Sequence, residues 1–301
     1  MQSPKRFEPN WEREAHSSRK VCRLEETGRK NIRGGFPMPP IAIFNLLAIG
    51  LVLFISVIQM LRRPRDRNME VLFFSCLLQF LVLFVDNAAL AIVTHATSIR
   101  YDEYVFCFDR LFGSPSFVIG RIFLEYSWFR NISLYAYVLI PAVCLGVVTA
   151  SFFWLPLKDA VCSVRTIFLS CLLAYPIYVI FPVAGPRYAF SNFPTAISGD
   201  FTPHLLHQSS IPNGVPSVHM ALALLVLWFC RPWAIARIFG VIFLALIVAS
   251  TLGSGEHYLL DLIVAVPYTG LVIYLGGYSP QEAKLVRASR HNSRLAVSAR
   301  S

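Results

Sequence analysis

Two short segments of the chain hold the side chains that could do chemistry. In the first, Gly255–Asp261 (Gly-Glu-His-Tyr-Leu-Leu-Asp), a histidine and an aspartate are four residues apart where an apolar stretch begins. On a helix this spacing places both side chains on one face, so Asp261 can accept the proton of one ring nitrogen of His257 and leave the other nitrogen free. His257 is therefore a candidate nucleophile or base.

The second segment places another histidine in a similar position. His219 follows Pro216, Ser217 and Val218, and it also begins an apolar stretch. A single histidine at a helix end is usually an interfacial polar residue, but two of them, one with an aspartate four residues on, indicate a shared site. Ser217 offers a hydroxyl and a helix-start amide to an anion, or it only caps the helix. This pattern predicts phosphoryl transfer, with one ring as the nucleophile and the other as the acid and base.

Three charged side chains add to this pattern. Arg187 leaves an apolar stretch within the order Gly-Pro-Arg-Tyr, and it is either a guanidinium clamp on phosphate or an anchor at the membrane surface. Glu256 precedes His257 and either raises its basicity or is a surface residue without a role. Asp261 lies one turn into an apolar helix, where a carboxylate is costly unless it is paired or functional.

The composition places the chain in a membrane. Of the 301 residues, 55% are hydrophobic and 15% are charged, and the mean hydropathy is +0.56. A soluble domain carries about 25% charged residues. The net charge of +10 is spread over tails and loops without interleaved aromatic residues, which favours contact with anionic lipid headgroups over nucleic acid. The seven cysteines occur singly, so the sequence implies no disulfide framework and no metal site.

Apolar stretches recur along the chain, and all of them except 216–230, which is short for a full span by itself, are long enough to cross a bilayer. They cover residues 41–61, 71–93, 132–155, 166–184, 216–230, 233–252 and 257–275. Pro141 predicts a kink in the third stretch. The predicted fold class is all-α, a polytopic helical membrane protein with about six to eight transmembrane helices.

The distribution of Lys and Arg predicts the orientation. If the stretches alternate in direction, most basic side chains gather on one face, which the positive-inside rule makes cytoplasmic. Both histidines then face the outer side, periplasmic or lumenal. The basic N-terminal tail would also lie outside, so either it is translocated or the residues 116–130 hide a further span, although Arg121 and Glu125 argue against that.

The two histidine segments resemble a known family. Pro-Ser-x-His at residues 216–219, followed by His-x-x-x-Asp at 257–261, is similar to the type 2 phosphatidic acid phosphatase (PAP2) superfamily of membrane enzymes. The form Gly-Glu-His-Tyr at 255–258, together with Gly-Pro-Arg-Tyr at 185–188, is more similar to the branch that contains inositol phosphorylceramide synthase and related inositolphosphotransferases. The resemblance covers about residues 167–273.

The resemblance implies a role for each candidate residue. His257 would be the nucleophile, Asp261 its orienter, His219 the acid and base, and Arg187 and Ser217 phosphate ligands. The implied function is transfer of a phosphoryl headgroup, phosphoinositol being one candidate, between lipids through a phosphohistidine intermediate, without a cofactor. Donor and acceptor lipids are the expected partners.

The chain also departs from the phosphatase pattern of this family. Thr251 stands where an arginine is usual, Ile180 where a lysine is usual, and Val218 where a glycine is usual. The loss of two cations favours the transferase branch over a lipid phosphatase that hydrolyses phosphatidic acid or polyprenyl phosphates, which is the alternative. A transporter or scaffold that uses Asp86, His219 and Asp261 as buried polar sites is a third hypothesis, but the sequence shows no inverted repeat.

Four regions follow from these observations. We expect a disordered basic tail at residues 1–36, N-terminal transmembrane helices with an outer loop at 37–160, a PAP2-like catalytic transmembrane core at 161–277 and a second disordered basic tail at 278–301.

Overall fold

The computed structural model describes residues 47, 50–55, 57–58, 61, 67–97, 100–190, 192–195 and 210–277. They belong to one compact unit, Ile43–Ser301. As expected, every regular element among them is an α-helix. The helices are α3 (Arg67–Ala96), α4 (Asp102–Leu111), α5 (Pro115–Glu125), α6 (Ser127–Val138), α7 (Ile140–Trp154), α8 (Leu157–Leu172), α9 (Ala174–Ile180), α10 (Pro186–Ala189), α11 (Val218–Cys230), α12 (Ala234–Gly253) and α13 (Leu259–Leu275).

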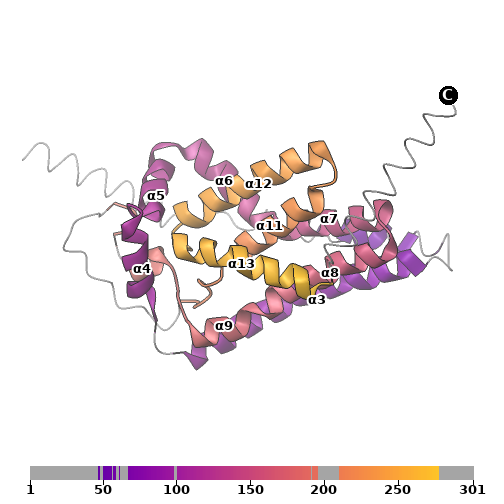
Figure 1. Cartoon of the computed structure of the whole chain (residues 1–301), viewed down its shortest axis with the longest axis horizontal. Helices are drawn as coiled ribbons and strands as arrows, with labels where there is room; N and C mark the ends of the chain where they lie inside the picture. Colours follow the sequence, from indigo (N-terminus) through magenta and orange to yellow (C-terminus); the bar gives the residue numbers. More distant parts are fainter. Residues whose placement is uncertain are drawn as a thin grey trace, which may run out of the picture. The chain divides into compact units, whose positions relative to one another are not determined.

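The three C-terminal helices, α11, α12 and α13, consist almost entirely of apolar residues, and the two histidine segments lie at the starts of α11 and α13. Helix α11 packs against α12 and also against α13, and Figure 1 shows it between them. Leu225 and Val226 of α11 and Ile247 of α12 are buried in the largest apolar cluster of the described residues. Helices that are apolar on all sides are typical of a buried core or of a membrane span. Their starts at residues 218 and 259 place His219 and His257 at helix ends.

The kink predicted at Pro141 is confirmed. Helices α6 and α7 meet at Leu139 with a bend of 53°, and Pro141 lies in the first turn of α7. Proline lacks the N–H that would continue the hydrogen bonding of a straight helix. The bend matters for the site because Tyr137, in the last turn of α6, lies directly before it.

Two helices of the described chain are long and apolar enough to cross a membrane. They are Leu157–Ile180, which combines α8 and α9, and Ala234–Gly253; the bent pair of α6 and α7 makes a third if it counts as one span. Val218–Cys230 and Leu259–Leu275 are shorter apolar helices. These observations agree with a membrane protein, and the larger expected number of spans stays a prediction.

Several sequence predictions fall partly or wholly outside the described residues. The basic tails lie there entirely, and the first predicted span lies there in part. Asp86 belongs to α3, but its side chain is not among those described. The stretch suspected of hiding a further span, residues 116–130, forms α5 and the start of α6, and α5 has only 11 residues.

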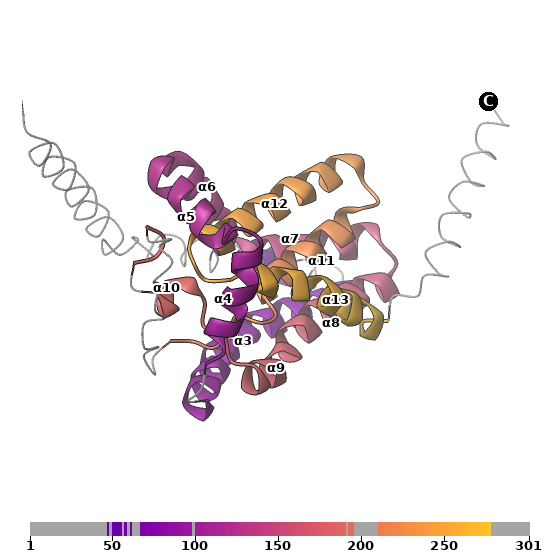
Figure 2. The same cartoon turned by 60° about the vertical axis from the view of Figure 1, so that its left-hand side comes forward.

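Helix α4 contacts the C-terminal helices although it is short and partly polar. It packs against α13 and against α10, and Figure 2 shows it beside the start of α13. Its buried face includes two acidic residues, Asp102 and Asp109. Because carboxylates are rarely buried without partners, these two positions indicate specific hydrogen bonding at that end of the bundle.

Candidate active site

The ring of His257 is buried next to the first turn of α13. Its Nδ1 lies 3.1 Å from the carbonyl oxygen of Gly214 and 3.2 Å from Oδ2 of Asp261. Both partners are acceptors, so Nδ1 carries the proton and donates it. The lone pair of the neutral ring is then on Nε2, which makes no hydrogen bond to any described residue. A histidine nucleophile needs this arrangement.

Asp261 orients the ring and caps the helix at the same time. Its Oδ2 accepts the backbone N–H of Tyr258 at 2.9 Å in addition to the proton of His257. The side chain is completely buried. The carboxylate lies at the third position of α13, where it satisfies one of the free N–H groups at the start of the helix. Its negative charge also interacts favourably with the positive end of the helix dipole. The predicted spacing of four residues therefore gives the predicted contact.

Backbone contacts bring the two histidine-bearing helix starts together. The N–H of Ser217 donates to the carbonyl of Asp261 at 3.2 Å, which joins the start of α11 to α13. The N–H of Gly214 donates to the carbonyl of Val183 at 2.7 Å. A Cβ at Gly214 would come within 2.8 Å of Val183, so glycine is required for this approach. The approach holds the Gly214 carbonyl against His257.

His219 lies in the first turn of α11 and is half-buried. Its ring stacks on Tyr137 of α6, with the ring centroids 4.1 Å apart and the planes at 19°. Its Nδ1 lies 3.4 Å from the hydroxyl oxygen of Tyr137. The centroids of the His219 and His257 rings are 6.1 Å apart, and no hydrogen bond joins the two rings. The second candidate histidine is thus a neighbour of the first, and Tyr137 sets its orientation.

Arg187 reaches the site through the residue that precedes His257. Its Nη1 forms an ion pair with Oε1 of Glu256 at 2.6 Å, and its backbone N–H donates to the Gly255 carbonyl at 3.0 Å. The hydroxyl of Tyr188 donates to Oε2 of Glu256 at 3.2 Å. The Arg187 side chain is 48% exposed, so much of the guanidinium stays open to an anion. Glu256 is therefore the ion-pair partner of Arg187. The sequence had left open whether Glu256 is a surface residue without a role.

The pKa values of Arg187 and Tyr188 are both shifted by their surroundings. Burial lowers the pKa of Arg187, but the charges of Glu256 and Tyr188 and the hydrogen bond to Glu256 together outweigh this effect, and the net pKa is raised. Burial, followed by the carboxylate of Glu256, raises the pKa of Tyr188 to about 12. Arg187 therefore keeps its charge and Tyr188 its proton at physiological pH. Both are then able to donate hydrogen bonds to phosphate oxygens.

Ser217 acts as the N-cap of α11. Its Oγ accepts the backbone N–H of Met220 at 3.3 Å, and the side chain is completely buried. This is the capping role that the sequence left open beside anion binding. Its role as a phosphate ligand stays a prediction.

Two aspartates of α4 hold the loops of the site, and sequence reasoning missed both. Asp102 accepts hydrogen bonds from the backbone N–H groups of Ala184 and Gly185 and, at 3.2 Å, from the hydroxyl of Tyr258. It thereby fixes the segment before Arg187 and the residue after His257. Asp109 accepts the N–H of Leu259 at 2.8 Å and the hydroxyl of Ser116 at 2.9 Å. No local spacing relates these residues to the histidines.

A glycine lets the Arg187 segment approach the His257 segment. Gly185 has a φ of 110°, which residues with a side chain rarely adopt, and a Cβ there would collide with the carbonyl of Glu256. In the segment Gly-Pro-Arg-Tyr, Gly185 is therefore required by the backbone conformation, and Arg187 supplies the charge.

The structure brings all five predicted site residues to one end of α11 and α13. His257 and Asp261 are in direct contact, His219 lies beside them, and Ser217 joins them through its backbone N–H. Arg187 joins through Glu256. Their catalytic and binding roles remain predictions from the pattern. Tyr137, Asp102, Asp109 and the carbonyl of Gly214 are additions that only the structure supplies.

The apolar helices and the paired histidines at neighbouring helix starts define a class, a helical membrane protein with its polar site at one end of the bundle. Residues 106–275, more than half of the chain, match the PAP2 superfamily. The chain belongs to this superfamily, which confirms the broader resemblance found in the sequence. Comparison with curated proteins finds no match. Comparison with solved structures finds none either.

We expect the variant Asp102→Asn to change how stability depends on pH. Burial, opposed by its hydrogen bonds, raises the pKa of Asp102 from 3.8 to about 6. Between these values the unfolded chain loses a proton that the folded protein retains, so rising pH destabilises the fold, by ~3 kcal/mol in all. Asparagine does not titrate. The thermal midpoint of the parent protein should therefore fall relative to the variant from about pH 4 to about pH 6 and run parallel to it above about pH 7. A constant difference across the whole range would contradict the assignment.

Proposed function

We propose that this protein is a lipid phosphotransferase, which moves a phosphoryl headgroup from a donor lipid to an acceptor alcohol through a phosphohistidine. Membership of the PAP2 superfamily indicates phosphatase or phosphotransferase activity on lipids. One observation carries the proposal. The Gly214 carbonyl and the Asp261 carboxylate both accept the Nδ1 proton of His257, which leaves Nε2 with a free lone pair.

In the first step, Nε2 of His257 attacks phosphorus. A nitrogen–phosphorus bond forms, the bond from phosphorus to the donor oxygen breaks, and the departing alkoxide takes a proton from His219, whose protonated form is favoured by the negative charge of the bound phosphate. The positive charge that develops on the His257 ring is balanced by Asp261, which is already bonded to Nδ1. Arg187 offsets the charge on the phosphoryl oxygens.

In the second step, His219 is neutral and acts as the base. It takes the proton of an acceptor alcohol, the alcohol oxygen attacks phosphorus, and the nitrogen–phosphorus bond breaks to restore His257. The ring of His219 is held by stacking on Tyr137, so it does not have to be positioned again between the two steps. No cofactor takes part in this sequence.

We favour transfer over hydrolysis because the phosphatase pattern has two cationic side chains that this chain lacks, at Thr251 and Ile180. Thr251 is completely buried, and its hydroxyl donates to the carbonyl of Ile247 at 2.8 Å, so it offers nothing to a phosphate. Ile180 is 76% exposed and apolar. Phosphoinositol is the headgroup to test first, because of the resemblance of the segments around Arg187 and His257 to inositolphosphotransferases.

The test follows the phosphorus in purified protein reconstituted into vesicles. Phosphatidylinositol labelled in its phosphate is supplied with and without ceramide or diacylglycerol as the acceptor, in parallel with labelled phosphatidic acid. Label that moves to the acceptor lipid supports the transferase. Rapid release of free phosphate from phosphatidic acid, with no response to added alcohols, would replace it with the phosphatase.

We also propose that the site faces the outer side of the membrane. Arg165 donates from Nε to the carbonyl of Gly276 at the end of α13, at 2.9 Å, and Arg231 follows the last residue of α11. Both histidines lie at the opposite ends of these helices. In a cysteine-free background, Ile211→Cys should react with an impermeant thiol reagent on intact cells, and Lys158→Cys should not. The reverse result would place the chemistry inside.

The variant Glu256→Gln should strengthen anion binding at Arg187. Glu256 competes with phosphate for the guanidinium, and a partly exposed ion pair of this kind is worth up to about 1 kcal/mol. The inhibition constant of orthovanadate should therefore fall, by up to about fivefold, whereas Glu125→Gln, an exposed position in α5, should not change it. Unchanged or weaker inhibition in Glu256→Gln would remove Arg187 from the phosphate site.

A further inference from the structure

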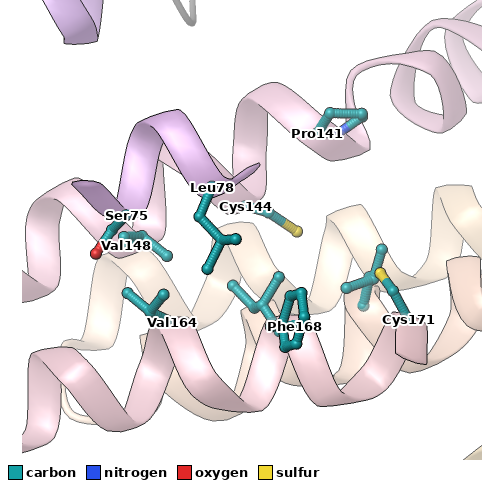
Figure 3. A pocket seen from close by; sticks show the side chains of 10 residues that line it. Ser75, Leu78, Pro141, Cys144, Val148, Val164, Phe168 and Cys171 are labelled. Carbon is teal, nitrogen blue, oxygen red and sulfur yellow. The ribbon is translucent and has the colours of Figure 1, made fainter. Parts of the chain in front are cut away.

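An apolar pocket lies between helices α3, α7, α8 and α11. Its volume is about 80 Å³, and its lining includes Leu78, Cys144, Val148, Val164 and Phe168. Figure 3 shows these side chains facing one another across the space between the helices. The one hydroxyl in the lining, that of Ser75, already donates to the carbonyl of Val71 at 2.6 Å. Apart from this hydroxyl and the thiols of Cys144 and Cys171, which are weak hydrogen-bonding groups, the lining consists of apolar side chains, and apolar cavities of this kind stay dry.

The walls of the pocket continue from the residues of the site. Leu222, in the lining, is three residues after His219 and so lies on the same face of α11, one turn deeper. Pro141, also in the lining, lies one turn after Tyr137, beyond the bend between α6 and α7. The stacked pair of Tyr137 and His219 is thus followed by residues that line the pocket, on α11 after His219 and on α7, beyond the bend, after Tyr137.

The pocket opens on one side. Cys144 and Val148 at its base are buried, whereas Val164, Phe168 and Leu78 are half-buried or exposed. In a protein of the membrane, such apolar surface meets hydrocarbon. A volume of 80 Å³ is about half of the ~150 Å³ cavity that admits benzene, so it accepts a segment of a chain rather than a whole one.

We propose that this pocket holds part of one hydrocarbon chain of the lipid substrate while the phosphate of that lipid lies at the two histidines. The inference rests on the proposed function and extends it to the recognition of a long-chain lipid. A chain that leaves the bilayer for the pocket gains little hydrophobic free energy, because it was already in an apolar medium. The gain is in position: a held chain restricts where phosphorus lies relative to Nε2 of His257.

A matched pair of variants on α8 tests this position effect. Val164 lines the pocket, and Val161, one turn earlier and 39% exposed, does not. With a donor that carries two long acyl chains, Val164→Phe should lower kcat about tenfold with little change in KM, because the chain is displaced and the phosphorus is misplaced. With a water-soluble donor that carries two six-carbon chains, the same variant should keep the parent rate. Val161→Phe should change neither rate, and an equal effect of Val164→Phe on both donors would overturn the proposal.

A cross-linking measurement separates this proposal from the proposed function. Phosphatidylinositol with a photoreactive diazirine at the end of one chain is incorporated into phosphatidylcholine vesicles with the protein. Label should appear on peptides of α8 or α11 that line the pocket, should persist in His257→Ala, and should be lost in Val164→Phe. Excess phosphatidylinositol should compete and excess phosphatidylcholine should not. Label that neither lipid displaces would mark an ordinary bilayer lipid and sink the proposal, even if the protein transfers headgroups.

Discussion

Replacement of His257 by alanine should abolish the phosphoenzyme and lower headgroup transfer by at least ~10⁴-fold, the largest effect that we expect of any single change. The ring supplies a nitrogen, Nε2, with a free lone pair and a fixed direction, because Nδ1 is held by Gly214 and Asp261. Protein incubated with labelled donor and quenched rapidly in base should carry acid-labile label, and His257→Ala should carry none.

The control for this measurement is His95→Ala. His95 is an exposed histidine in the last turn of α3. It should leave both the label and the rate unchanged. If His257→Ala keeps the parent amount of label while its thermal midpoint shows that it is folded, the nucleophile is another residue.

Asp261→Asn should lower transfer by about 10²- to 10³-fold, less than the loss of the nucleophile. The amide cannot balance the charge that develops on the His257 ring. Part of the orientation survives, however, because the Gly214 carbonyl still accepts the Nδ1 proton at 3.1 Å. Rapid-quench measurement should show that the phosphoenzyme forms, but much more slowly than in the parent protein.

Two comparisons complete the test of Asp261. Asp159→Asn, at the start of α8, should have the parent rate, because α8 carries none of the proposed catalytic or phosphate-binding residues. Full activity in Asp261→Asn would show that the Gly214 carbonyl alone orients the ring, and Asp261 would then be a helix cap only. Equal losses in Asp261→Asn and His257→Ala, with both proteins folded, would mean that the carboxylate is needed for any attack at all.

The sequence predicted those parts of the fold and site that depend on neighbours along the chain. The contact of His257 with Asp261 follows from helical geometry over four residues, and the bend at Pro141 follows from a missing N–H. The apolar stretches also gave the helices α11, α12 and α13 within two residues at each end. These features need no knowledge of how the helices pack.

Contacts between segments far apart in the chain could not be predicted from the sequence. Tyr137 stacks on His219, 82 residues away, and Asp102 binds the hydroxyl of Tyr258 over a separation of 156 residues. Sequence reasoning also missed that Arg187 pairs with Glu256. Tyrosines and acidic residues are common near membrane surfaces, so their presence alone indicates no partner.

The sequence by itself therefore determined that the chain has apolar helices, a histidine with its aspartate, and a second histidine at another helix start. Helical periodicity and hydropathy are local properties, and they act before any helix meets another. Only the tertiary structure decided that the two histidine rings lie beside each other with their centroids 6.1 Å apart, that the carbonyl of Gly214 fixes the proton on Nδ1 of His257, and that Tyr137 holds His219. These are decided by packing, because the positions of helix starts relative to one another depend on side chains and loops from the whole compact unit.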